Sequence, residues 1–267
     1  MKNYLSNYLC LLAFVFIVSS CTKNETIVTP ITIAHRGLYS DRPENSKQSF
    51  QECLKKGITS VEFDVYMTKD DSIILVHDLN VEDVAGLPGQ VNEYTTQELK
   101  NAIFAKTGAK TLTFNEFLNR YKNRFNKIFI DLKEGQGTDI IYKTSIQIAK
   151  LAQTEGGTCK TFVTCTSAYP LDTIMQINPS INTVLEINNV QDYLQSSQRF
   201  SYILIGYTNL VPEESKMIRD MGTRIITFTP NTVTEYKTAL ENGCYAIMTD
   251  DPSLLNDYLA QTLPNEN

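Results

Sequence analysis

The sequence predicts an α/β fold, a (β/α)8 TIM barrel with a β-hairpin arm and a small insertion after the second barrel strand. Short runs rich in β-branched residues alternate with amphipathic stretches along the chain. This alternation is typical of a parallel sheet covered by helices. The chain has 267 residues, and the 247 that remain after residues 1–20 are close to the roughly 250 of such a barrel. We therefore expect one large domain.

Nine runs are expected to form strands, one more than the barrel needs. These strands are expected at 31–35, 60–67, 73–77, 128–132, 161–165, 182–187, 202–206, 224–228 and 245–249. Helices are expected at 45–56, 96–103, 113–124, 138–152, 169–177, 190–197, 212–221, 232–242 and 252–262.

The surplus strand is assigned to residues 73–77. Only the polar residues 68–72 separate it from the strand at 60–67. This connection is too short for a crossover helix, so the two strands must be antiparallel. With the turn centred near Asp70 and Asp71, residue 77 falls opposite residue 64. The run is thus the returning arm of a hairpin above the barrel, and eight barrel strands remain.

Residues 79–112 show weak periodicity and contain Gly86-Leu87-Pro88-Gly89. We expect them to form an inserted flap between the second and third barrel strands. Insertions at that face of a barrel often shape the substrate pocket. The sequence contains no repeat or linker that would mark a second domain.

The N-terminal residues have the pattern of an export signal. Lys2 supplies a positive start, the eleven residues 8–18 are apolar, and Ser19 and Ser20 are small. That apolar run is too short for a hydrocarbon core, which needs about 20 residues. Because Cys21 follows at once, the segment resembles a bacterial lipoprotein signal, in which the cysteine is acylated and becomes the new N-terminus. An ordinary cleaved signal is the alternative.

These features predict an exported lipoprotein, held to the cell envelope by lipid at Cys21, in the periplasm or at the outer surface. Residues 1–20 would be the signal peptide, 21–30 a polar tether and 31–267 the barrel domain. The formal net charge of −6 argues against nucleic acid as a partner. The later cysteines lack CxxC spacing, so a zinc site is not expected and buried free thiols are expected rather than disulfides. They are Cys53, Cys159, Cys165 and Cys244.

The only two histidines, His35 and His77, each end an apolar run. Between them, Glu62 and Asp64 lie two residues apart in an expected strand, where such residues point to one face. Burying unpaired carboxylates costs several kcal/mol unless a cation or hydrogen bonds compensate. Two proton carriers beside paired oxygen ligands indicate a metal-assisted acid/base enzyme. The alternatives are structural histidines and a salt-bridged carboxylate pair at the barrel rim.

A series of motifs resembles the glycerophosphodiester phosphodiesterase family in order and spacing. The motifs are His35-Arg36-Gly37, Pro43-Glu44-Asn45-Ser46, Glu62-Phe63-Asp64-Val65, Thr68-Lys69-Asp70 and His77-Asp78, with looser agreement at 110–118 and 243–252. The resemblance implies metal-dependent hydrolysis of a glycerophosphodiester to glycerol phosphate and an alcohol. It also implies that His35 and His77 are the general acid and base, in an order the sequence leaves open. A glycerol hydroxyl would attack phosphorus, and water would open the resulting cyclic phosphate.

The resemblance also assigns the metal ligands. Glu62 and Asp64 match the family's ligand pair, and hard oxygen donors suit one divalent cation, Mg²⁺ or Ca²⁺. Asp131 is the expected third ligand, where most members carry glutamate. Aspartate is one methylene shorter, so the metal must sit closer to the strand or accept a bridging water. Related sphingomyelinase D enzymes use an aspartate at this place.

Further residues are assigned to the substrate or its surroundings. Arg36 and Lys133 would contact the phosphate, the arginine through two phosphoryl oxygens. For Lys133 the alternative is a surface lysine. Glu44 would orient Arg36, and Asn45 would cap the first helix. Phe228 stands where the family often has tryptophan, and would either wall the glycerol pocket or pack in the core.

Two other functions are compatible with parts of this pattern. The same chemistry could act on a lysophospholipid, a teichoic-acid-like polymer or a sugar phosphodiester. A non-catalytic barrel could instead bind phosphorylated glycans or lipids. Two proton carriers argue against that class, because a binding module has no need of them, and fold alone could not decide it.

Overall fold

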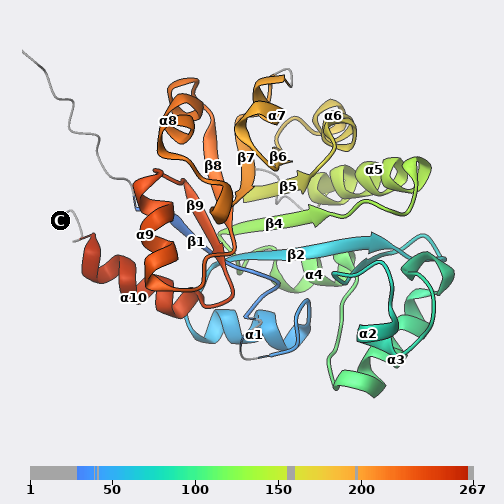
Figure 1. The fold of residues 1–267 in the computed structure, drawn as a ribbon. Coiled ribbons are helices and arrows are strands. Elements are labelled where there is room, and N and C mark those ends of the chain that lie inside the picture. The colour runs from blue at the N-terminus through green and yellow to red at the C-terminus, as the bar shows by residue number, and fades with distance from the viewer. Residues whose placement is uncertain (1–28, 39, 41, 155–159, 196–197, 264–267) are drawn as a thin grey trace, which may run out of the picture.

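Eight parallel strands form a closed barrel (Figure 1). The structure is a computed structural model that describes residues 29–38, 40, 42–154, 160–195 and 198–263. The predicted signal peptide, Cys21 and Cys159 lie outside these residues. The barrel strands are β1 (Ile31–Ala34), β2 (Ser60–Met67), β4 (Lys127–Leu132), β5 (Thr161–Cys165), β6 (Asn182–Ile187), β7 (Tyr202–Gly206), β8 (Arg224–Phe228) and β9 (Ala246–Thr249). Because β1 pairs with both β2 and β9, the sheet closes on itself.

A helix follows each barrel strand and covers its outer side, with a hairpin and an insertion preceding the helix after β2. The helices are α1 (Lys47–Lys55), α4 (Phe114–Tyr121), α5 (Thr138–Thr154), α6 (Ala168–Ile177), α7 (Val190–Gln195), α8 (Pro212–Asp220), α9 (Val233–Glu241) and α10 (Pro252–Thr262). The predicted (β/α)8 barrel is therefore confirmed. None of the described helices is long and apolar enough to cross a membrane.

Local sequence explains where the covering helices begin. Thr113 accepts a hydrogen bond from the backbone N–H of Glu116, whose side chain accepts one from the N–H of Thr113 at 2.9 Å, which is a capping box at the start of α4. Thr232 and Glu235 repeat this arrangement at the start of α9. The inner faces of these helices are apolar, so packing on the barrel adds to the local preference.

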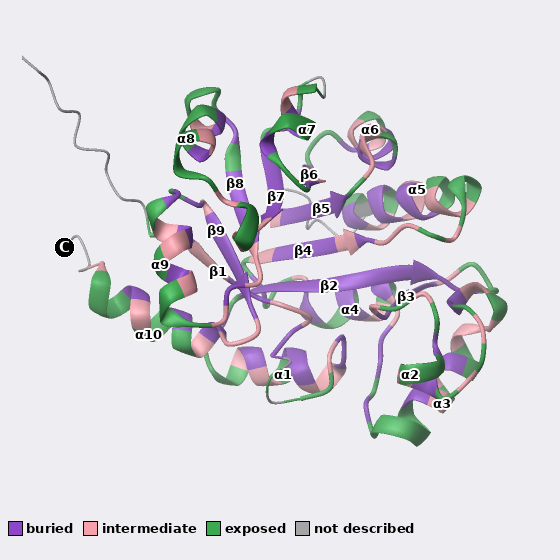
Figure 2. Cartoon of the chain, viewed as in Figure 1, coloured by how far each residue is buried: buried purple, intermediate pink, exposed green. Residues whose placement is uncertain are grey.

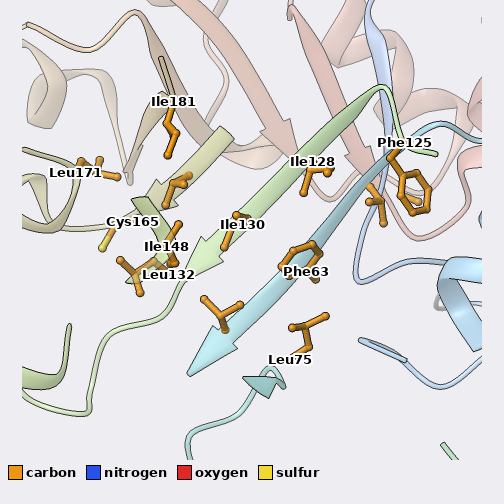
Figure 3. Close-up of a cluster of buried hydrophobic side chains, with 14 of the residues drawn as sticks. Phe63, Leu75, Phe125, Ile128, Ile130, Leu132, Ile148, Cys165, Leu171 and Ile181 are labelled. Atoms are coloured by element: carbon orange, nitrogen blue, oxygen red, sulfur yellow. The ribbon is translucent and has the colours of Figure 1, made fainter. Parts of the chain in front are cut away.

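Two apolar layers hold the barrel together, because alternate strand residues point inward and outward. The inner layer consists of strand residues, including Phe129 and Phe162, whose rings stack with centroids 4.5 Å apart. The outer layer joins strands to helices. Figure 3 shows part of it, with Phe63, Ile128, Ile130, Leu132 and Cys165 on strands and Ile148 and Leu171 on helices. Figure 2 shows β2 buried along its whole length.

The short strand β3 (Ile73–Leu75) pairs antiparallel with β2, which confirms the predicted hairpin arm. The predicted register is wrong by one residue, because Val65 pairs with Leu75 and residue 76 therefore lies opposite Asp64. The N–H of Thr68 donates to the carbonyl of Ser72, so the loop between them has three residues. Its last residue, Asp71, has a φ of 60°, as three-residue hairpin loops require.

The insertion after β3 folds as a small helical unit on the hairpin. It contains α2 (Glu82–Ala85), the 3₁₀ helix Val91–Glu93 and α3 (Thr96–Thr107). Val81, Leu99 and Ile103 pack against Tyr66 and Ile74 of the hairpin in a separate apolar cluster. The predicted flap is thus confirmed as an ordered insertion.

Three cysteines, Cys53, Cys165 and Cys244, are buried free thiols, as the sequence predicted. Burial raises the pKa of each thiol to about 12. They are packing residues within the described part of the chain.

Candidate active site

Predicted site residues from distant parts of the sequence meet at the carboxyl end of the barrel strands. There they line a cavity of about 180 Å³. Its walls are His35, Arg36, Glu62, His77, Asp131, Lys133, Thr164, Glu186, Leu204, Phe228, Thr229 and Met248. The remaining predicted residues, Glu44 and Asp64, contact members of this set. Active sites of such barrels form at this end.

The turn after β1 has an unusual backbone conformation. Arg36 has a φ of 54° and Gly37 a φ of 79°, a region that residues other than glycine rarely adopt. A Cβ on Gly37 would lie 2.3 Å from the hydroxyl oxygen of Ser49. The turn lets the Arg36 N–H donate to Glu62 Oε2 at 2.9 Å. Glycine is therefore required where the chain passes closely over α1.

His35 is held in a defined tautomer by groups on both ring nitrogens. Arg36 Nε donates to His35 Nε2 at 3.2 Å, and His35 Nδ1 lies 2.6 Å from Asp250 Oδ1. Since an arginine N–H can only donate, Nε2 accepts and the ring proton is on Nδ1. Asp250 Oδ2 accepts from Asn231 at 2.7 Å. Burial opposes ionisation of Asp250, but its hydrogen bond with His35 keeps its pKa below the usual value.

Asp250 was not among the predicted site residues. Its signal was available, because it follows the last barrel strand within the closing motif at 243–252. Carboxylates that orient a histidine are common in acid/base sites. The sequence gives no indication, however, that this carboxylate rather than Asp251 reaches His35.

His77 reaches the same cavity from the hairpin side, despite the one-residue shift in register. Its Nδ1 lies 2.8 Å from Asp78 Oδ1, and the Asp78 side chain is 55% exposed. The two histidines therefore approach one cavity from β1 and from the end of β3. Each has a carboxylate at its Nδ1.

Glu62, Asp64 and Asp131 form a compact group of carboxylates. Each offers one oxygen, and these atoms all lie within 4.8 Å of one another. Asp64 and Asp131 are register partners on β2 and β4. Burial, followed by the charges of Asp64 and Asp131, raises the pKa of Glu62 well above its usual value. Carboxylate oxygens at this spacing fit a hard divalent cation, including with the shorter aspartate at 131.

Lys133 lies within this group rather than at the surface. Its Nζ is 2.6 Å from Asp131 Oδ2 and 3.0 Å from Asp64 Oδ1. Burial disfavours the ammonium, but the two aspartates outweigh burial and raise the pKa of Lys133 above its usual value. Burial would also raise the pKa of Asp64, but Lys133 and His77 lower it. The surface-lysine alternative is therefore wrong.

The loop before α1 supports the site in two ways, one of which was predicted. Glu44 accepts from Arg36 at 2.7 Å and so orients the guanidinium. The predicted capping role of Asn45 is wrong, because Ser46 caps α1. Asn45 instead donates to Asp64 Oδ2 at 2.8 Å, and its side-chain oxygen accepts from the Asp64 N–H at 3.2 Å. With a φ of 51°, Asn45 fixes the position of Asp64.

Glu186, at the end of β6, is a cavity residue that the sequence analysis missed. It lies two residues after Val184 of the inner barrel layer, and this alternation was the available signal. Among the described residues, its carboxylate has no hydrogen-bond or ion-pair partner. Burial, followed by the charge of Asp131, raises the pKa of Glu186 to about 7. Its oxygens are therefore available to hydroxyl groups of a ligand.

In protein freed of divalent cations by a chelator, Glu186→Gln should be more stable than the parent, and the difference in stability should grow as pH rises. A carboxyl whose folded pKa is raised contributes its stability below the unfolded pKa, and that contribution is lost as pH rises through the folded pKa. The window thus runs from about 4.5 to about 7. Thermal unfolding of parent and variant at pH 5 and pH 8 measures the difference, with exposed Glu82→Gln as the control. A difference in unfolding temperature between the parent and Glu186→Gln that is the same at both pH values would contradict the buried position of the Glu186 carboxylate.

The cavity has one polar side and one apolar side. β1, β2, β4, β6 and the hairpin supply the ionisable groups, whereas Leu204, Phe228 and Met248 come from β7, β8 and β9. Phe228 thus walls the cavity, as one of its two predicted interpretations required. The arrangement suits a small ligand with an anionic group at one end and carbon–hydrogen surface at the other.

Comparisons with known proteins agree with this geometry. The model of the glycerophosphoryl diester phosphodiesterase family matches residues 35–254. A glycerophosphodiester phosphodiesterase of Caldanaerobacter subterraneus subsp. tengcongensis is 23% identical over 84% of this chain and 96% of its own. One of Bacillus subtilis is 24% identical over 92% of this chain and 93% of its own.

Solved structures with the same fold are also found. A phosphodiesterase of Oleispira antarctica, in complex with the product sn-glycerol-3-phosphate, superimposes with a TM-score of 0.76 at 18% identity, covering 86% of this chain and 97% of its own. A glycerophosphodiester phosphodiesterase of Parabacteroides distasonis gives 0.74 at 18% identity, covering 87% and 98%.

Proposed function

The chain belongs to the glycerophosphoryl diester phosphodiesterase family, and we propose that it hydrolyses glycerophosphodiesters to glycerol phosphate and an alcohol by two-histidine catalysis at a metal-dependent site. The observation that carries the proposal is the meeting of His35 and His77 at one cavity beside a compact group of three carboxylates. Phosphodiester cleavage needs one proton removed and one supplied, and imidazoles titrate near neutral pH.

Arg36 and Lys133 are the cationic groups that would receive the phosphate. Both line the cavity, and Glu44 holds the Arg36 guanidinium from behind at 2.7 Å. A guanidinium binds two phosphoryl oxygens in a planar fork, and an ammonium adds a point charge. Together they would neutralise the diester and fix its phosphorus between the two histidines.

We assign His35 as the base of the first step. Its Nδ1–H is directed at Asp250, so Nε2 carries the ring's lone pair, which accepts from Arg36 Nε in this structure and would take the substrate proton once Arg36 turns to the phosphate. His77 is the acid, with Asp78 at Nδ1 stabilising its protonated form. A glycerol hydroxyl loses its proton to His35 and attacks phosphorus, while the bond to the alcohol breaks and His77 protonates the leaving oxygen.

The second step reverses these roles. The first step leaves a cyclic phosphate, His35 protonated and His77 neutral. Water gives a proton to His77 and attacks phosphorus, the ring P–O bond breaks, and His35 returns its proton to the glycerol oxygen. Both histidines are then restored, and glycerol phosphate is the product.

Glu62, Asp64 and Asp131 would hold one divalent cation, Mg²⁺ or Ca²⁺. Their three oxygens are hard donors at suitable spacing. A bound cation supplies positive charge beside a phosphoryl oxygen and so stabilises the charge of the transition state. Asn45 fixes Asp64 independently of the cation, through two hydrogen bonds.

The glycerol half of the substrate suits the apolar side of the cavity. Phe228, Leu204 and Met248 would contact its carbon–hydrogen surface, and Glu186 would accept from a hydroxyl. The Oleispira phosphodiesterase bound to sn-glycerol-3-phosphate has this fold, which supports the product assignment. The cavity volume of about 180 Å³ matches a small polyol phosphate rather than an acyl chain.

A release assay tests the substrate proposal. Purified protein would be given glycerophosphocholine, glycerophosphoethanolamine, glycerophosphoglycerol, a lysophospholipid and a sugar phosphodiester, and glycerol phosphate would be quantified. We expect release from the soluble glycerophosphodiesters. Activity confined to the lysophospholipid or the sugar phosphodiester would show that this compound, and not a soluble glycerophosphodiester, is the substrate. Binding of these compounds without turnover would support the non-catalytic alternative.

The N-terminal pattern supports a further proposal, that Cys21 is acylated and anchors an exported protein to the cell envelope. In a bacterial host fed an alkyne analogue of palmitate, the parent should carry label and fractionate with membranes. Cys21→Ala should carry none, because the acylated thiol is gone. Cys53→Ala is the matched control, since its thiol is buried. Label retained on Cys21→Ala would exclude the lipoprotein assignment.

A further inference from the structure

The amino end of the barrel carries a concentration of positive charge although the whole chain is acidic, with a formal net charge of −6. At this end, connecting segments lead from the helices back into the barrel strands. In the described residues of these segments, with the first residue of each strand, there are seven lysines and arginines and no aspartate or glutamate. Four of the seven, Lys56, Lys122, Arg124 and Lys127, precede or begin β2 and β4.

The other three basic residues continue the set around the barrel. Lys160 precedes β5, where its Nζ donates to the carbonyl of Phe125. Arg199 precedes β7 and pairs with Asp172 of α6. Arg224 begins β8, with its guanidinium over the rings of Tyr202 and Tyr245 at 5.5 and 5.1 Å. We call these seven residues the basic ring.

Asp172 pairs with Arg199 of the basic ring, whereas two other acidic residues near this end have lysine partners of their own. Asp220 and Glu241 end α8 and α9, but each pairs with a lysine one turn back on its own helix. The carboxylates Glu44, Asp78 and Asp250 lie at the opposite end of the barrel, beside the catalytic cavity. The barrel strands, four to eight residues long, separate the two ends. Basic residues therefore gather at the amino end of the barrel, and these carboxylates lie at its carboxyl end.

We propose that the basic ring docks the barrel on an anionic lipid surface. Charge complementarity and the course of the chain support this occupant. The chain enters the barrel at this end, since Thr29 and Pro30 lead into β1 and lie beside Lys127 around a hollow of about 470 Å³. Tyr245, which is partly exposed beside the Arg224 guanidinium, suits the boundary between water and lipid headgroups.

Docking in this orientation would direct the catalytic cavity away from the lipid. Together with the proposed function, on which this consequence rests, it favours water-soluble glycerophosphodiesters over lipids still in the bilayer. The docking itself depends only on the basic ring. It can therefore fail or succeed independently of the reaction.

Vesicle binding of the full chain tests the proposal. Cys21→Ala removes the acylated thiol, and the apolar leader contributes alike in every sample. The ratio of binding to phosphatidylcholine vesicles with and without 30% phosphatidylglycerol then isolates the electrostatic part. The test variant is Lys56→Gln/Lys122→Gln/Arg124→Gln. Lys69→Gln/Lys106→Gln/Lys110→Gln, in the hairpin loop and the insertion away from this end, changes net charge equally.

We expect the anionic-to-neutral binding ratio to fall roughly 100-fold in the test variant, since each basic residue near such a surface contributes about fivefold. The control should retain the parental ratio, and 0.5 M NaCl should abolish the preference in all samples. Circular dichroism and release of glycerol phosphate from a soluble diester confirm that each variant is folded. Equal ratios in parent and test variant, or equal losses in both triple variants, would overturn the proposal.

Discussion

Replacing either histidine with alanine should lower kcat on an accepted glycerophosphodiester by roughly 10²–10⁴-fold, the usual contribution of a positioned acid or base. The structure gives the reason, because His35 and His77 line one cavity and each is paired with a carboxylate at Nδ1. Residues that act as a unit are not additive. The double variant should therefore be scarcely slower than the slower single variant.

Steady-state kinetics of the parent, both single variants and the double variant measure this effect. Gln97→Ala, at an exposed position of α3, is the control and should keep the parental kcat. Cation binding should be largely retained in all histidine variants, because neither histidine belongs to the carboxylate group. Near-parental turnover in His77→Ala would contradict both the catalytic role of His77 at the end of the hairpin and the two-histidine mechanism.

The second large effect concerns the carboxylates. Glu62→Gln/Asp64→Asn should abolish site-specific binding of Mg²⁺ and Ca²⁺, because it leaves one charged oxygen ligand of three. Calorimetric titration measures the binding heat. The variants should remain folded, since both amides can still accept the hydrogen bonds from Arg36 and Asn45 that the carboxylates accept now.

A matched titration separates this site from general acidity. Glu82→Gln/Asp83→Asn removes the same charge from exposed positions on α2 and should bind as the parent does. If the Glu62→Gln/Asp64→Asn protein gave the parental heat, the metal assignment would be wrong. Loss of heat in both double variants would show only a diffuse electrostatic effect.

The barrel could be predicted because its signals are local and repeated. Alternation of strand and helix patterns fixes the element order, and the short connection at 68–72 identifies β3 as a hairpin strand. The spacing of Glu62 and Asp64 fixes their shared face. The ends of parallel strands then bring His35 and Asp131 to the same mouth.

The missed features depend on tertiary geometry. The hairpin register follows from a three-residue loop with Asp71 at positive φ, which pattern reading does not fix. Asn45 has the composition of a helix cap, but a positive φ directs it to Asp64 instead. Asp250 and Glu186 contribute through the curvature of the barrel, which brings β6 and the segment after β9 to groups on β1 and β4. Local patterns place both residues at strand ends, but they do not show which groups the closed barrel brings to them.

The most direct test of a metal-dependent phosphodiesterase is one chelation cycle on the parent protein. Release of glycerol phosphate from glycerophosphocholine would be followed before EDTA, in EDTA, and after dialysis into Mg²⁺ or Ca²⁺, with Glu62→Gln/Asp64→Asn carried through the same cycle. We expect the parent's release to stop in EDTA and to return with one of the two cations, and the variant to stay inactive throughout. Parental release that continues undiminished in EDTA would contradict the assignment of Glu62, Asp64 and Asp131 as the ligands of an essential cation.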